Sequence, residues 1–223
     1  MIKLQQVFIG CPFTKGIRRS YDRLKNELEK ESPLHIVLAD TTAISSTDYL
    51  LESITNLIKD SATCIFDATD NNPNVSLEVG IAHAIPSDYV VTLRTRKPIR
   101  TIKKGKGKEQ IPIKSIISDL QGKMRIEYKT YDKLKDQLNK RHLNNLPYMK
   151  RWIEFKKNHH SYIPYAIKLF SDIRMSTRTV GTRIDTILAG SGIKRSDFLK
   201  ALKKYKLIVA REGKGGGYYY PTK

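Results

Sequence analysis

The chain has 223 residues, 39% of them hydrophobic and 28% charged, which is enough for a packed core in one or two domains. No segment approaches about eighteen consecutive apolar residues, and the first residues are too polar for a signal peptide, so we expect a cytoplasmic protein with no membrane contact. Both cysteines, Cys11 and Cys64, lie in apolar runs, which indicates buried thiols in a reducing compartment rather than a disulfide framework, and no Cys/His spacing typical of a metal site is present.

The formal net charge of +19 is unevenly distributed along the chain. Residues 1–93 contain 8 Lys and Arg against 12 Asp and Glu, whereas residues 94–223 contain 33 against 10. A strongly basic half indicates a polyanionic partner, most often nucleic acid. The alternative is a solvated, lysine-rich surface that has no such partner.

The first half of the chain alternates apolar runs with amphipathic stretches. The runs QQVFIG, HIVLAD, ATCIFDAT and YVVTLR predict four buried strands. Residues 17–31 and 47–61 carry apolar side chains at helical spacing, and residues 75–85 are interpreted as a third helix. Strands that alternate with helices are typical of a parallel sheet covered on both faces, so we expect a flavodoxin-like α/β fold. In the first helix the residues expected to face the core are Ile17, Tyr21, Leu24 and Leu28.

The middle of the chain is interpreted as a loop, a last strand and helix, and a connector. Residues 94–108 contain eight basic residues and no acidic one, with two glycines among the lysines, and predict a loop. A strand and a helix after residue 123 complete the first domain. Residues 148–175 look helical but interrupted at Pro164. We therefore divide the chain into a nucleotide-binding domain at 1–145, a helical connector at 146–175 and a basic domain at 176–223.

In the last domain the sequence predicts two helices followed by a hairpin with a glycine-rich turn. This is the order of elements in a winged helix. Its second helix turns Phe198, Leu199 and Leu202 inward. Cations on such a domain give affinity for phosphates without sequence specificity, although winged helices also serve protein contact or dimerisation. The residues expected to bind nucleic acid are Lys194, Arg195, Lys200, Lys203, Lys204, Arg211 and Lys214.

Residues 62–84 place a carboxylate in a small and apolar segment. Asp67 lies near the end of a predicted strand, where ligands of open parallel sheets bind. We expect Asn74 to cap a helix that starts at Val75, which puts Glu78 at the end of its first turn on the ligand side, where the helix dipole favours an ionised carboxylate. Such a group can attack or stabilise a carbon that becomes cationic, such as the anomeric carbon of a ribosyl group. A helix-start glutamate that contacts solvent is the alternative.

Three motifs carry a family resemblance: VFIGCPF at the first strand, FDAT at a later strand end, and NPNVSLEVGIAHA. Together with the later SDLQGKMRIEY, they resemble the nucleoside 2-deoxyribosyltransferase-like group and its relatives, the TIR-like nucleotide-binding domains. The resemblance covers about residues 5–140. It implies cleavage or exchange of an N-glycosidic bond, with deoxynucleosides as substrates of the transferases and NAD as substrate of many TIR-like enzymes.

The resemblance also implies roles for single residues. Glu78 matches the catalytic glutamate that acts at the anomeric carbon, and Asp67 matches the aspartate at the sugar-binding edge. The first loop, which borders the sugar and base, is matched by Gly10, Pro12 and Phe13. Lys15 and Arg18 lie at a helix start, a position that suits the binding of phosphate. The alternative is that both are surface charges. With Asn74 added, the residues expected to bind substrate are Gly10, Pro12, Phe13, Lys15, Arg18 and Asn74.

The basic domain departs from the small single-domain transferases of this group, which are oligomeric. Our first hypothesis is therefore an N-glycosidase or ribosyltransferase that acts on a nucleotide or NAD without a further cofactor, coupled to a nucleic-acid-binding tail, as would suit a bacterial defence effector. The alternatives are a nucleotide-sensing DNA-binding regulator without turnover, and a scaffold that only self-associates. A homo-oligomer is expected by resemblance.

Overall fold

The computed structural model describes residues 2–39, 47–95, 99–104, 107–112, 125–175, 184–210 and 217–221. Five strands form one parallel sheet in the order β2-β1-β3-β4-β7. This is the strand order of flavodoxin-like folds, so the predicted fold class is confirmed. The strands are β1 (Lys3–Gly10), β2 (His35–Leu38), β3 (Ser61–Asp67), β4 (Tyr89–Arg94) and β7 (Arg125–Tyr128).

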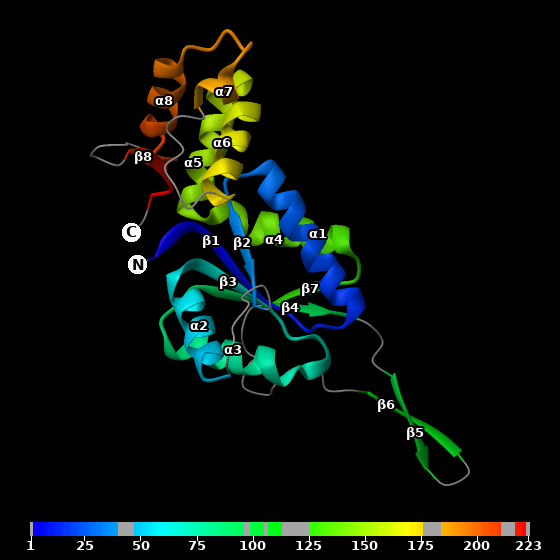
Figure 1. The fold of residues 1–223 in the computed structure, drawn as a ribbon. Helices are drawn as coiled ribbons and strands as arrows, with labels where there is room; N and C mark the ends of the chain where they lie inside the picture. The colour runs from blue at the N-terminus through cyan, green and yellow to red at the C-terminus, as the bar shows by residue number, and fades with distance from the viewer. Residues whose placement is uncertain are drawn as a thin grey trace.

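Helices cover both faces of this sheet, which explains why its strands are almost continuously apolar (Figure 1). Successive side chains of β1 point to opposite faces, so Val7 and Ile9 join one core while Phe8 joins the other. The first core contains α1 (Lys15–Glu31) and α4 (Tyr131–Arg141), and the second contains α2 (Thr47–Asp60) and α3 (Pro73–Ala84). In α1 the buried residues are the four predicted ones, Ile17, Tyr21, Leu24 and Leu28.

The stretch predicted as a lysine-rich loop contains a hairpin. Strands β5 (Ile99–Lys104) and β6 (Gly107–Pro112) pair antiparallel, with Thr101 opposite Gln110. The loop prediction is therefore wrong for these residues, because a two-stranded ladder is made by backbone groups and tolerates charged side chains. Figure 1 shows the hairpin projecting away from the sheet.

After α4, the described residues fold as four further α-helices and a short hairpin. Helices α5 (Pro147–Asn158) and α6 (Ile163–Met175) are separated by a single 3-10 turn, η5 (His160–Tyr162). The interruption therefore precedes Pro164, which lies in the first turn of α6, where proline is tolerated. Then follow α7 (Ile184–Leu188), α8 (Arg195–Lys204) and the antiparallel pair β8 (Val209–Ala210) and β9 (Tyr218–Tyr219). Phe198, Leu199 and Leu202 of α8 are buried, as predicted.

These helices share the α1-side core with the sheet. Trp152 of α5 and Phe170 of α6 are fully buried in the same cluster as Ile9 of β1. Figure 1 shows α5 to α8 gathered on one side, with α2 and α3 on the opposite face of the sheet. The division at 1–145, 146–175 and 176–223, and the winged helix, stay predictions. None of the helices described has both the length and the apolar character that crossing a membrane requires.

Candidate functional site

Glu78 turns its carboxyl group inward, onto the end of β1. Glu78 is buried, with a relative exposure of only 6%. A Cβ placed on Gly10 would lie 1.8 Å from Glu78 Oε2 and 2.9 Å from Phe66 Cδ1. The carboxyl group therefore packs directly on the backbone of Gly10, the last residue of β1. Only glycine leaves room for that contact, so the two residues form one local structure at the carboxyl edge of the sheet.

The carboxyl group of Glu78 lies in apolar surroundings. Within the part of the chain that the structure describes, Glu78 Oε2 is buried and has no hydrogen-bond partner. Burial raises the pKa of Glu78 to about 7, because the charged form loses hydration without gaining a partner. At neutral pH the group is therefore divided between its neutral and ionised forms, whereas the sequence led us to expect a fully ionised group.

The start of α3 explains that difference. Asn72, not Asn74, is the N-cap: its side-chain oxygen accepts from the backbone N–H of Asn74 at 3.0 Å and of Val75 at 3.3 Å. Pro73 is the first helical residue, so the helix begins two residues earlier than predicted. Glu78 then lies in the second turn, beyond the reach of the favourable dipole end. Asn74 itself is exposed in the first turn.

Asp67 lies at the end of β3 but on the other face of the sheet. Its neighbour Phe66 packs with Phe8 on the α3 side, so the alternation along the strand directs Asp67 toward α1. There Asp67 Oδ2 accepts from the hydroxyl of Tyr21 at 2.9 Å and from that of Tyr128 at 2.5 Å. Oδ1 accepts from the backbone N–H of Thr69 at 2.9 Å.

This network links Asp67 to three elements of the fold. The residue is completely buried, and burial raises its pKa although three donors favour its charged form. Both oxygens already accept hydrogen bonds, and they link β3 to α1 and β7. The structure therefore places Asp67 and Glu78 on opposite faces of the sheet, and the catalytic role expected for Asp67 stays a prediction.

The roles of the tyrosines in this network were not predicted from the sequence. Tyr21 was counted only as an apolar residue of the first helix, yet its hydroxyl bonds both Asp67 and Thr92 Oγ1, the latter at 2.6 Å. A tyrosine within an otherwise aliphatic stripe needs a partner for its buried hydroxyl, and that signal was available.

The first loop lies at the same sheet edge as Glu78. Pro12 is buried, while Phe13 is 56% exposed and Lys15 opens α1 on the surface. Arg18 is partly buried and forms an ion pair with Asp22 at 3.0 Å. The first turn of α1 contains no acidic residue. The predicted substrate residues other than Asn74 are thus gathered around the carboxyl end of β1.

The predicted nucleic-acid residues differ in availability. Lys194, Lys200, Lys203 and Lys204 are exposed on or beside α8. Arg195 instead contacts Asp185 of α7, with 2.6 Å between Nη1 and Oδ2, so part of its charge is already compensated. Arg211 and Lys214 lie outside the described residues.

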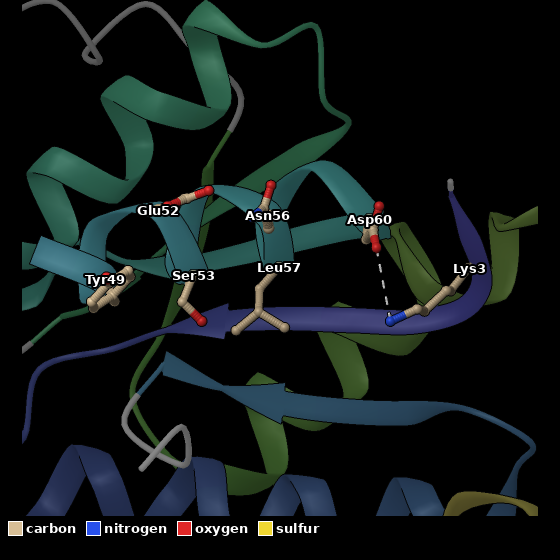
Figure 2. A pocket seen from close by; sticks show the side chains of 7 residues that line it. All are labelled: Lys3, Tyr49, Glu52, Ser53, Asn56, Leu57 and Asp60. Atoms are coloured by element: carbon tan, nitrogen blue, oxygen red, sulfur yellow. Dashed lines mark ion pairs between the residues drawn. The ribbon is translucent and has the colours of Figure 1, made fainter. Parts of the chain in front are cut away.

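A hollow of about 430 Å³ lies beside α2 (Figure 2). Figure 2 shows Ser53 and Leu57 of α2 directed toward β1, while Lys3 reaches Asp60 at 3.8 Å across one end. Of the predicted site residues that the structure describes, none lines it. Among the described residues, no group of three His, Cys, Asp or Glu is placed to hold a metal ion.

Comparisons with known proteins find matches to this chain in structure but not in sequence. No protein-family profile and no curated protein matches the sequence. Eight solved chains match the structure, among them one described as "2-desoxiribosyltransferase from Leishmania mexicana". That match has 11% identity and a TM-score of 0.45, and covers 62% of this chain and 99% of the other. At these values it carries no functional argument, and the fold assignment rests on the strand order.

Proposed function

We propose that this protein cleaves or exchanges the N-glycosidic bond of a nucleotide or NAD, with Glu78 as the catalytic carboxylate. One observation carries the proposal: a buried carboxyl group, packed on Gly10 at the carboxyl edge of the sheet, that has an oxygen without a hydrogen-bond partner among the described residues. Leaving a buried polar atom unpaired is costly, so a role for that atom with a ligand is the physical reason to retain it.

The chemistry follows from the position and the pKa of Glu78. The base leaves with the electron pair of the C1′–N bond, which makes the anomeric carbon cationic. An ionised Glu78 in apolar surroundings stabilises that charge or bonds to C1′, and water or a second acceptor then completes the transfer. A pKa of about 7 keeps both the neutral and the ionised form available near neutral pH, which suits a group that also gives or takes a proton.

The start of α1 supports a phosphorylated substrate. Its N-cap residue Thr14 makes no side-chain capping bond, the exposed Lys15 lies at the carboxyl end of β1, and the first turn has no acidic residue. A helix start with nearby cations suits phosphate. A nucleotide or NAD therefore fits this edge better than a free nucleoside does.

The test is release of free base. Purified protein is incubated with NAD and with nucleosides and nucleotides, with and without DNA, and the products are separated by chromatography. Glu78→Gln should lose release by at least about a hundredfold while remaining folded. Gly80→Ala, on the same helix but with nothing within 4 Å of the added Cβ, is the matched control and should retain it. If the wild-type protein binds nucleotide yet releases no base under any condition, the enzyme proposal is wrong and the protein is a nucleotide-sensing regulator without turnover.

We also propose nucleic acid as the partner of the basic half, in a defence effector whose catalytic site responds to it. The exposed Lys194, Lys200, Lys203 and Lys204 support this partner. A nucleotide-sensing DNA-binding regulator would use the same surface. Base release that rises on addition of DNA favours the enzyme over the regulator.

A further inference from the structure

Two hollows adjoin each other along the outer face of α8. The first is lined by Ser196, Leu199, Lys200, Lys203 and Lys204 of that helix. The second lies between α5 and the end of α8, and is lined by Arg151, Glu154, Lys204, Tyr205 and Lys206. Because Lys204 lines both, the two hollows form one continuous surface. We call this surface the α8 track and define it by Ser196, Lys200, Lys203, Lys204, Tyr205, Lys206 and Arg151.

The charge of the α8 track is almost entirely positive. It carries five cations, with Glu154 as the one acidic residue that lines either hollow. Within the described residues, none of these five cations forms an ion pair, in contrast to Arg195, which pairs with Asp185. Unpaired cations brought together on one face repel each other unless an anion lies between them. The track therefore has the charge that a polyanion would require.

Lys206 occupies a backbone conformation that favours glycine. Its φ is 52°, just after the last turn of α8, where the N–H of Leu207 bonds to the carbonyl oxygen of Leu202 at 3.0 Å. Helices commonly end with a left-handed residue at this place, and glycine adopts it without steric cost. A lysine here brings a cation to the second hollow at a conformational cost. This observation is independent of the charge count.

Tyr205 adds an aromatic ring to the same hollow. It is only partly buried, and the rings of Phe155 and His159 support it edge-on, each with 5.7 Å between centroids. Lys204 Nζ lies 5.6 Å from the centroid of the Tyr205 ring. An aromatic ring among cations is typical of surfaces on which unpaired bases stack while the backbone follows the charges.

We propose that the α8 track binds the phosphate backbone of a nucleic-acid strand, and that α5 is part of the site through Arg151. This rests on the nucleic-acid partner proposed above and deepens it, because Arg151, Tyr205 and Lys206 lie outside the predicted recognition helix. From Ser196 to Lys204 the helix advances by about 12 Å, the length of about three to four nucleotides along one strand. The nucleic-acid strand lies along α8 from Ser196 to the hollow at Tyr205.

The test measures oligonucleotide affinity by fluorescence anisotropy as a function of salt. The probes are a labelled thymidine single strand and a mixed duplex, each about 12 nucleotides long, with heparin as a polyanion that lacks phosphate. The variants are Lys206→Gly, Lys204→Ala and Arg151→Ala. The matched control is Lys133→Ala, which removes an exposed lysine from α4. Lys206→Gly best separates an effect on binding from an effect on stability, because glycine adopts that backbone conformation readily. Its melting temperature should therefore stay equal to that of wild type or rise.

Each track variant should weaken binding about three- to tenfold at moderate salt and lower the slope of log K against log salt by about 0.7 on the single strand, or 0.9 on the duplex. The control should change neither. A single strand that binds more tightly than the duplex assigns Tyr205 to base stacking, and the reverse assigns the track to duplex backbone. Equal losses on heparin and on the oligonucleotides, or variants that bind like wild type, overturn the inference. Base release by wild-type protein is measured separately, so failure of the track is distinguishable from failure of the catalytic proposal.

Discussion

At the residue scale, Gly10 and Glu78 are coupled by direct contact. The carboxyl oxygen occupies the space where any other residue at position 10 would place its Cβ. The cost of this arrangement is a carboxyl group that is buried without a partner among the described residues, and its pKa of about 7 reports that cost. The pair therefore reduces stability, and this makes two predictions possible.

The first prediction concerns stability as a function of pH. The folded protein holds the Glu78 proton more tightly than the unfolded chain does, since its pKa is raised from 4.5 to about 7. Deprotonation between these values therefore favours unfolding, and the penalty is complete above pH 7 and absent below about pH 4.5. Glu78→Gln, which never ionises, should raise the free energy of unfolding by up to about 3 kcal/mol at pH 8 and by little at pH 4.5. Urea unfolding of both proteins across this pH range is the measurement. A gain that does not depend on pH would contradict the buried, unpaired carboxyl group.

The second prediction uses the two glycines near Glu78. Gly10→Ala should destabilise the protein by about 1–3 kcal/mol and reduce base release, because the added methyl group displaces both the Glu78 carboxyl and the Phe66 ring. Gly80→Ala should be neutral or stabilise by up to about 1 kcal/mol, since nothing lies within 4 Å of its Cβ and alanine is the better helix former. Thermal melts and product chromatography measure both effects. If Gly10→Ala behaves like Gly80→Ala, the contact is not as close as described.

At the element scale, the start of α3 decides where Glu78 lies. Asn72 caps the helix and Pro73 opens it, so Glu78 lies two residues further into the helix than an Asn74 cap would have placed it. The second carboxylate of this region, Asp67, instead holds β3, α1 and β7 together through Tyr21, Tyr128 and Thr69. The helix α3 buries the carboxyl group of Glu78, and the neighbouring strand β3 links α1 and β7 through Asp67.

The cap gives a prediction with its own control. Asn72→Ala should lower the free energy of unfolding by about 1 kcal/mol, because two backbone N–H groups lose their acceptor. Asn74→Ala should change it by less than about 0.5 kcal/mol, since this side chain is exposed and caps nothing. Denaturant unfolding of the two variants measures the difference. The reverse order would restore the cap expected from the sequence.

At the scale of the whole molecule, Arg174 of α6 connects the basic half to the junction between α1 and β2. Its guanidinium donates to the carbonyl oxygens of Glu29 at 2.8 Å and Leu34 at 3.1 Å, which flank the end of α1, and to the hydroxyl of Tyr220 at 3.3 Å. The apolar core runs without a break from β1 to α8. The two halves are therefore expected to unfold together.

This connection is testable by unfolding. Arg174→Ala should cost about 2 kcal/mol, because hydrogen bonds from a charged donor to three acceptors are lost. Lys168→Ala, which removes an exposed lysine from the same helix, should cost less than about 0.5 kcal/mol. Wild-type protein should melt in one transition by far-UV and near-UV circular dichroism. Two separate transitions would show that the halves are independent.

Much of the fold was predictable because it follows from local periodicity. The four residues of α1 that face the core, the apolar strands, and the inward Phe198, Leu199 and Leu202 of α8 all repeat at the spacing of their element. The hairpin of β5 and β6 was missed, because charge concealed a backbone pairing that side chains do not specify. The helix start was misjudged by two residues, since two asparagines compete for the cap and only the three-dimensional path of the chain chooses between them.

The amino-acid sequence by itself determined the alternation of strands and helices, the division of charge between the halves, and the presence of one carboxylate in an apolar segment. Only the tertiary structure decided that Glu78 and Asp67 face opposite sides of the sheet, and that Glu78 Oε2 has no partner among the described residues while Asp67 accepts three hydrogen bonds. The physical reason is that periodicity depends on neighbours along the chain. Hydration, pKa and hydrogen bonding depend instead on residues such as Gly10, Tyr21 and Tyr128, which folding brings together from distant positions.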